Sequence, residues 1–195
     1  MNGPLLGGAV AHATRCRAGG AASSIGRVTV LVLTLVGDDR AGLVASVSRA
    51  IAEHGGNWER SELAELAGTF AGLVEVVVPD SAAEELRAAL SALDGTLTVA
   101  VHENPHAAER SGVDLSFTVL GNDSPGIVRE LATALESHGL SIDHLSTETR
   151  DAAMAGGRLF EATFTARMPA GGDAAAVRAA LEAVATELQV DVSLV

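Results

Sequence analysis

The chain carries the same succession of apolar and polar positions twice. Residues 28–36 and 113–120 are apolar runs of strand length, and positions 113–119 alternate strictly between apolar and polar side chains. A helical stripe follows each run, with apolar residues at i, i+1, i+4 and i+8. The stripe consists of Leu43, Val44, Val47 and Ile51 in the first half and of Ile127, Val128, Leu131 and Leu135 in the second. The pattern predicts a duplicated unit, and a duplication determines the architecture before any residue has a role.

The same further elements follow in both halves. Strands are predicted over 57–66, 70–78 and 96–102 in the first half and over 141–150, 158–168 and 189–195 in the second, with an amphipathic helix before the last strand of each. The order β-α-β-β-α-β is that of an α+β ferredoxin-like unit, a four-stranded antiparallel sheet with two helices on one face. We therefore expect two tandem domains over 27–103 and 113–195, joined by a linker over 104–112.

The second face of each predicted sheet has no helix to cover it. In the first strand, Val30, Val32 and Val36 form an extra apolar row on that face. Domains of this size have marginal cores, and burying several hundred Å2 of apolar surface contributes several kcal/mol at ~25 cal/mol per Å2. The sequence therefore predicts pairing, either between the two domains of one chain or between copies in a homo-oligomer.

Acidic residues outnumber arginines in both halves. The formal net charge is −12, there is no lysine, and all 13 basic residues are arginine. Residues 28–103 contain 12 acidic residues and 4 arginines, and residues 113–195 contain 12 and 5, so the net charges are −8 and −7. Neither half has a basic cluster. Direct binding of nucleic acid or of an anionic membrane is therefore disfavoured, because basic residues supply most of the non-specific affinity for phosphate.

The first 26 residues differ from the remainder of the chain. They are rich in Gly, Ala and Ser and contain no acidic residue. We expect a disordered tail or a misassigned start codon, with a transit peptide as the minority alternative. Cys16 is the only cysteine, so an internal disulfide is excluded and a cytoplasmic location fits. No apolar stretch reaches the ~20 residues of a membrane-spanning helix.

The connection between the first strand and the first helix is the candidate binding segment. Gly37, Asp38 and Asp39 recur at the same place in the second half as Gly121, Asn122 and Asp123. The glycines are predicted to let the backbone turn, and the helix amides that follow attract a carboxylate. The Asp and Asn side chains would receive an ammonium group, so the segment suits a free amino acid. An equally open alternative is that the carboxylates only cap the helix.

The sequence contains few other candidates for metal-ligating or catalytic residues. His102 and His106 are four residues apart, but Pro105 lies between them and no second ligand pair accompanies them. No nucleophile, base and oxyanion donor occur in a recognisable pattern. The sequence therefore predicts no catalytic residues, no metal, no cofactor and no enzyme.

These motifs resemble those of the ACT domain, a small amino-acid-binding regulatory module. The shared pattern is Gly-(Asn/Asp)-Asp-x-x-Gly-(Ile/Leu)-Val after a strand, then a helix ending in His-Gly at 54–55 and 138–139. More specific stretches are Asn57-Trp58-x-x-Ser61 with Phe70-Ala71-Gly72, and residues 145–149 with 157–161. They resemble tandem ACT regulators of glycine metabolism, and the resemblance covers residues 28–195.

The resemblance implies an amino-acid-sensing regulatory protein without catalytic or DNA-binding parts. Such proteins control transcription of glycine and one-carbon metabolism by holding a protein partner, a LysR-type transcriptional activator, until glycine or a similar effector binds. The ligand-binding positions that it implies are Gly37, Asp38, Asp39, Gly42 and Asn57 in the first half and Gly121, Asn122, Asp123, Gly126 and Ser141 in the second.

Two departures from the family pattern bear on these positions. Arg40-Ala41 stands where the second half has Ser124-Pro125, and Ser141 stands where many ACT domains have Asn. One half could therefore bind a ligand while the other only pairs. The alternatives are a ligand-free ACT pairing module, a regulatory subunit of a metabolic enzyme, or the regulatory half of an enzyme such as a formyl-folate hydrolase.

Overall fold

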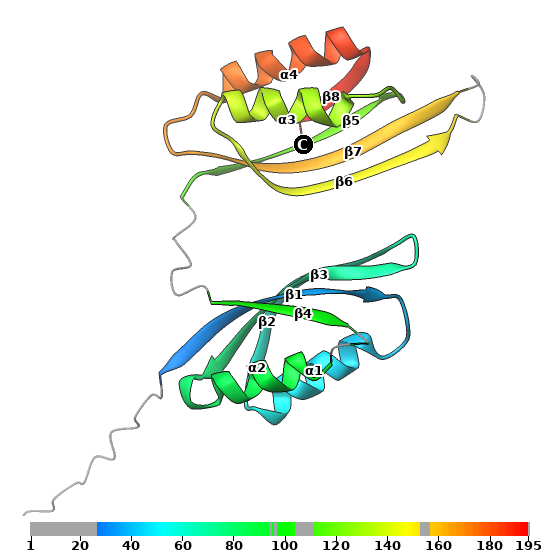
Figure 1. The fold of residues 1–195 in the computed structure, drawn as a ribbon. Coiled ribbons are helices and arrows are strands. Elements are labelled where there is room, and N and C mark those ends of the chain that lie inside the picture. The colour runs from blue at the N-terminus through cyan, green and yellow to red at the C-terminus, as the bar shows by residue number, and fades with distance from the viewer. Residues whose placement is uncertain (1–26, 94, 96, 104–110, 153–156, 195) are drawn as a thin grey trace, which may run out of the picture. The chain divides into compact units, whose positions relative to one another are not determined.

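The computed structural model describes residues 27–93, 95, 97–103, 111–152 and 157–194. The chain divides into two compact units between residues 106 and 107 (Figure 1). The predicted tail over 1–26 lies outside the described residues, as does residue range 104–110 of the predicted linker. The predicted domain boundaries stay predictions, and each unit is described by itself.

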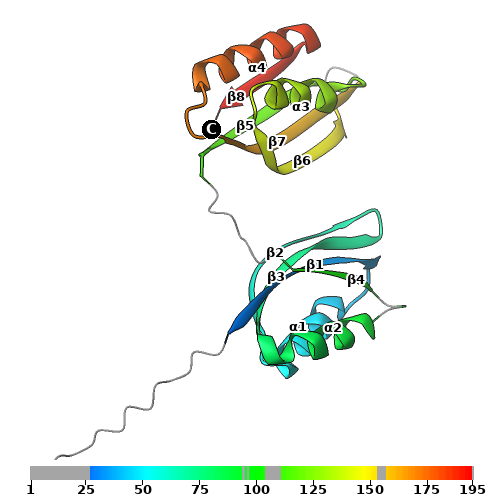
Figure 2. The ribbon, with the colours of Figure 1, turned by 60° about the vertical axis from the view of Figure 1, so that its left-hand side comes forward.

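The first unit contains one strand–helix–strand–strand–helix–strand succession. Its elements are β1 (Val28–Asp38), α1 (Leu43–Glu53), β2 (Asn57–Leu66), β3 (Thr69–Pro79), the short 3-10 helix η1 (Asp80–Ala82), α2 (Ala83–Ser91) and β4 (Thr98–Glu103). The strand order is β2-β3-β1-β4 with antiparallel neighbours. Both helices cover the same face of this sheet (Figures 1 and 2).

The second unit repeats this arrangement. Its elements are β5 (Val113–Asn122), α3 (Ile127–Ser137), β6 (Ser141–Asp151), β7 (Arg158–Met168), α4 (Ala174–Leu188) and β8 (Val190–Leu194). The strand order is β6-β7-β5-β8, again antiparallel. Both units are four-stranded sheets with two helices on one face, so the predicted α+β fold class is confirmed.

Each unit has a hydrophobic core between its sheet and its helices. In the first unit, alternate residues of β1 and β3 are fully buried against the apolar stripes of α1 and α2. These sheet residues are Leu31, Leu33, Leu35, Val74, Val76 and Val78. In the second unit, Phe117 of β5 stacks on Phe164 of β7, with ring centroids 4.8 Å apart. Each core consists of residues of one unit.

The predicted helical stripes are not buried along their whole width. Val44 and Val128 keep 43% and 37% of their surface exposed, although each follows a buried residue of the stripe. Successive helical residues point about 100° apart, so a stripe that begins with two adjacent apolar residues does not bury both equally.

Candidate functional site

The end of the first strand of each unit lies within its sheet. Gly37 pairs with Phe70 of β3, and Gly121 pairs with Phe160 of β7. The turn predicted at these two glycines is therefore wrong. The antiparallel partner strand continues to the same point, so the backbone of β1 and of β5 remains extended through the glycine and through Asp38 or Asn122.

The backbone turns two residues later than predicted. Asp39 donates its backbone N–H to the carbonyl oxygen of Gly68 at 2.8 Å, and Asp123 donates to Arg158 at the same distance. The turn is completed by Gly42 and Gly126, which adopt left-handed backbone with φ of 94° and 104°. Residues with a Cβ rarely adopt this conformation, which explains a glycine immediately before each helix.

The carboxylates of Asp39 and Asp123 do not cap the helices that follow. The N-cap residues are Gly42 and Gly126, and among the described residues neither α1 nor α3 receives a side-chain cap hydrogen bond. The capping role predicted as an alternative is thus wrong, because each carboxylate comes three residues before the N-cap. The first helical turn therefore presents amide donors and the positive end of the helix dipole without a side-chain acceptor.

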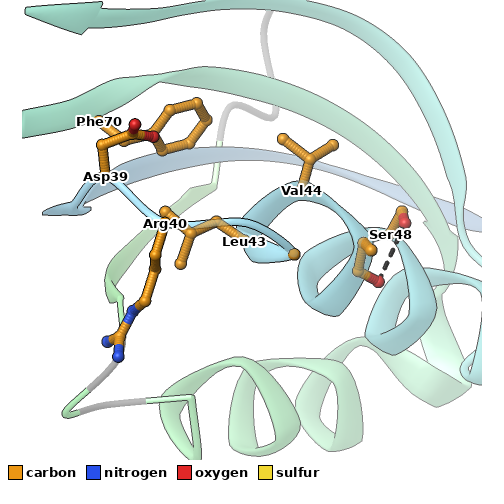
Figure 3. A pocket seen from close by; sticks show the side chains of 8 residues that line it. Asp39, Arg40, Leu43, Val44, Ser48 and Phe70 are labelled. Atoms are coloured by element: carbon orange, nitrogen blue, oxygen red, sulfur yellow. Dashed lines mark hydrogen bonds between the residues drawn. The ribbon is translucent and has the colours of Figure 1, made fainter.

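A surface hollow of about 510 Å3 lies against this bend in the first unit. Figure 3 shows it at the start of α1, with Arg40 extending away from Asp39 toward the connection between α2 and β4. Arg40 donates from Nη2 to the Gly95 carbonyl oxygen at 3.5 Å. The hollow is lined by Asp39, Arg40, Gly42, Leu43, Val44, Ala45, Ser48 and Phe70.

The lining combines three kinds of group that suit an amino-acid zwitterion. Asp39 can accept hydrogen bonds from an ammonium group, and Arg40 together with the start of α1 can receive a carboxylate. Half-exposed Val44 and Phe70 add an apolar wall. The sequence had not singled out these two residues as lining a site. In the sequence, the signal that could have pointed to Phe70 is its rarity, because only 3% of the residues are aromatic. Its position opposite Gly37 is known only from the strand register of the structure.

The equivalent bend in the second unit has a different composition. Ser124-Pro125 replaces Arg40-Ala41. Arg129, in the first turn of α3, places another guanidinium close to this bend, since its Nη2 would lie 3.4 Å from a Cβ added at Gly126. Arg129 also pairs with Glu130 at 2.5 Å. Phe160, which occupies the position of Phe70, is only 7% exposed. The second bend therefore retains the charged groups and lacks the accessible aromatic ring.

Asn57 and Ser141 do not lie with the other predicted positions of their own unit. Asn57 begins β2 and pairs with Val77, which in turn pairs with Val30 near the start of β1. At about 3.3 Å per residue, Val30 and Asp39 are about 30 Å apart along β1. Asn57 instead donates to the Glu59 carboxylate at 2.6 Å. Ser141 occupies the equivalent place in β6, so each unit brings together only the positions at its bend.

A metal centre is not found among the described residues, in which no group of three His, Cys, Asp or Glu side chains is close enough to hold a metal ion. In the same residues, no helix is both long and apolar enough to cross a membrane.

Known proteins resemble this chain in both sequence and fold. Residues 29–103 match the family model of the ACT domain. The glycine cleavage system transcriptional repressor of Escherichia coli (strain K12) is 28% identical over 167 residues, which is 84% of this chain and 88% of that protein. A crystal structure of an unknown protein from Galdieria sulphuraria has a TM-score of 0.77 at 29% identity, covering 86% of this chain and 98% of the other. A second structure, provisionally assigned as a glycine cleavage system transcriptional repressor, has a TM-score of 0.64 at 22% identity and covers 86% and 96%, which supports the fold.

Residues 29–103 thus match the ACT domain, and the second unit repeats the β-α-β-β-α-β topology of the first. The chain resembles the glycine cleavage system transcriptional repressor along most of its length. The resemblance predicted from the Gly-Asx-Asp bends is thereby confirmed.

Proposed function

We propose that this protein is an amino-acid-sensing regulator that controls transcription of glycine and one-carbon metabolism by contacting a protein partner, such as a transcriptional activator. The observation that carries the proposal is the hollow at the β1–α1 bend, which is lined by a carboxylate, an arginine and the uncapped start of a helix. The transcriptional role is transferred from the named repressor that the chain resembles.

Charge supports action through a protein rather than through DNA. The chain has a net charge of −12, and its acidic residues are distributed over both halves. Contact with the phosphate backbone would therefore be repulsive at the ionic strength of a cell. The proposal also states that the protein regulates without catalysing a reaction.

The amino-acid part is tested by thermal unfolding in the presence of each free amino acid at millimolar concentration. A ligand with as few heavy atoms as glycine has a limiting affinity near the micromolar range, at about −1.5 kcal/mol per atom. At 100 times its Kd, a ligand adds about 2.7 kcal/mol, which raises Tm by several degrees. We expect such a shift for glycine or a similar amino acid.

Two variants test whether the ligand that raises Tm binds at the bends. Asp39→Ala and Asp123→Ala remove one exposed carboxylate each, so both should fold normally and lose part or all of the ligand-induced shift. The control is Glu53→Ala, which removes an exposed carboxylate at the far end of α1. If both bend variants keep the full shift, the bends are not the site. If no amino acid raises Tm in the wild type, the second candidate, a ligand-free pairing module, takes its place.

A further inference from the structure

The hollow at the β1–α1 bend is larger than the smallest amino acid requires. Its volume of about 510 Å3 lies within the ~300–1,000 Å3 of sites that bind small molecules. A water-sized group takes about 30 Å3, so the five heavy atoms of glycine occupy on the order of 150 Å3. If Asp39 and the start of α1 hold the backbone of an amino acid, most of the hollow remains for its side chain.

The part of the hollow next to Asp39 has apolar walls. Phe70 of β3 is half-buried, and Val44 of α1 keeps 43% of its surface exposed. Figure 3 shows the Phe70 ring and the Val44 side chain on the same side of the bend as Asp39, and the Arg40 guanidinium on the other side. An apolar side chain of a ligand would therefore leave water and contact an aromatic ring and a branched hydrocarbon group, which is favourable.

Two polar side chains of the lining are engaged within the unit. Ser48 donates its hydroxyl hydrogen to the Ala45 carbonyl oxygen at 3.2 Å, and Arg40 donates to the Gly95 carbonyl oxygen. A hydroxyl or amide group on the side chain of a ligand would lose water here and meet mainly hydrocarbon, which weakens binding. The lining therefore favours an apolar side chain over a polar one of the same shape.

Ala45 leaves these walls accessible. The equivalent residue in the second unit is Arg129, because each is the third residue of its helix. Its Nη2 would lie 3.4 Å from a Cβ added at Gly126, so an arginine at this helical position reaches back to the bend. At position 45 such a side chain would bring a charged group beside the apolar walls. Alanine at this position keeps the hollow open and uncharged there.

We propose that the first unit selects an amino acid with an apolar side chain of about the size of valine or leucine. Val44 and Phe70 are the specificity-determining contacts, and Ala45 leaves room for the ligand beside them. This inference rests on the proposed binding of an amino acid at the same bend and names the class of that ligand. Complete burial of such a side chain strengthens binding by a factor of about 10 to 100, and an open hollow achieves the lower end, about tenfold.

The test uses pairs of amino acids that have the same shape and differ in polarity. Leucine is paired with asparagine and valine with threonine, and each dissociation constant is measured by isothermal titration calorimetry on the full chain. We expect leucine to bind about tenfold more tightly than asparagine, and valine more tightly than threonine. Glycine is titrated alongside them and measures the binding of the amino-acid backbone alone.

Three variants locate the preference for an apolar side chain. Ala45→Arg introduces the side chain of the second unit and should lower the ratio of the asparagine and leucine Kd values from about ten to about one. Val44→Thr keeps the shape of the wall and removes a methyl group, so it should reduce the ratio by about threefold. The matched control is Ala52→Arg, the same substitution at an exposed position of α1 about 10 Å further along the helix, which should retain the wild-type ratio.

The outcomes separate this inference from the proposed function. Ala45 and Ala52 are both exposed, so both arginine variants should keep the wild-type circular dichroism spectrum and ligand-free Tm. If glycine binds but leucine binds no better than asparagine, the selectivity is overturned while amino-acid sensing stands. A preference that persists in Ala45→Arg, or is lost equally in Ala52→Arg, also overturns it. Binding of none of these amino acids would overturn both.

Discussion

At the scale of single residues, Gly121 has a packing role that explains its identity. It pairs with Val190 of β8, and an added Cβ would lie 2.5 Å from Val190 Cγ1 and 2.9 Å from its Cα. Gly121→Ala should therefore lower the free energy of unfolding by about 1–3 kcal/mol, as overpacking does. Urea unfolding of the full chain measures this loss.

Val190 provides the control for this prediction. Because its Cγ1 atom is the nearest contact, Val190→Ala should relieve part of the strain. The double variant Gly121→Ala/Val190→Ala should then be more stable than the sum of the two single changes indicates. Additive losses would show that the close approach of β8 does not set the requirement for glycine.

The residue scale is also where the sequence is least informative. A glycine and a carboxylate before a helix are equally compatible with a turn, a cap and a ligand contact. The structure separates these roles: Gly42 and Gly126 make the turn, Gly121 accommodates β8, and Asp39 and Asp123 cap nothing. Each role depends on where the neighbouring strands end, and those neighbours are distant in the sequence.

At the scale of elements, α4 has the side-chain cap that α1 and α3 lack. The carboxylate of Asp173 accepts hydrogen bonds from the amides of Ala175 at 2.9 Å and Ala176 at 3.1 Å. Asp173→Ala should destabilise the second unit by about 1 kcal/mol. For a unit of this size, that loss lowers Tm by about 4–8 °C in a calorimetric scan.

Glu182→Ala is the matched variant for this element. Its side chain is exposed in the middle of the same helix, so removing the carboxylate should leave Tm within about 2 °C of the wild type. Equal effects of the two substitutions would mean that the loss comes from charge rather than from the cap.

The elements themselves were predictable from periodicity. The predicted strands 57–66 and 158–168 coincide with β2 and β7. Glycine or proline residues flank both segments, and β7 also alternates between buried and exposed positions. The first strand was predicted two residues too short, ending at residue 36 rather than Asp38. Glycine weakens a strand signal, and only the pairing with β3 shows that the ladder continues through Gly37.

At the scale of the whole molecule, the duplication predicted the architecture, because two similar successions of apolar and polar positions predict two similar folds. The two cores share no residue: one is built around Leu33 and Leu86, the other around Phe117 and Leu131. We therefore expect a defect in one core to leave the packing of the other core unchanged. The duplication alone does not show that the outer sheet faces differ, but the first strands do: the first half has the extra apolar row Val30, Val32 and Val36, whereas positions 113–119 alternate strictly.

Independent cores make the two units separable in stability. Leu131 is fully buried in the second unit, so Leu131→Ala should cost about 2–5 kcal/mol there. Hydrogen exchange measured by mass spectrometry should show faster exchange in β5, β7 and α3, with unchanged protection in β1, β3 and α1. Leu86→Ala, a fully buried leucine of α2, should give the reverse pattern. Loss of protection in both units from either change would show that they unfold as one cooperative body.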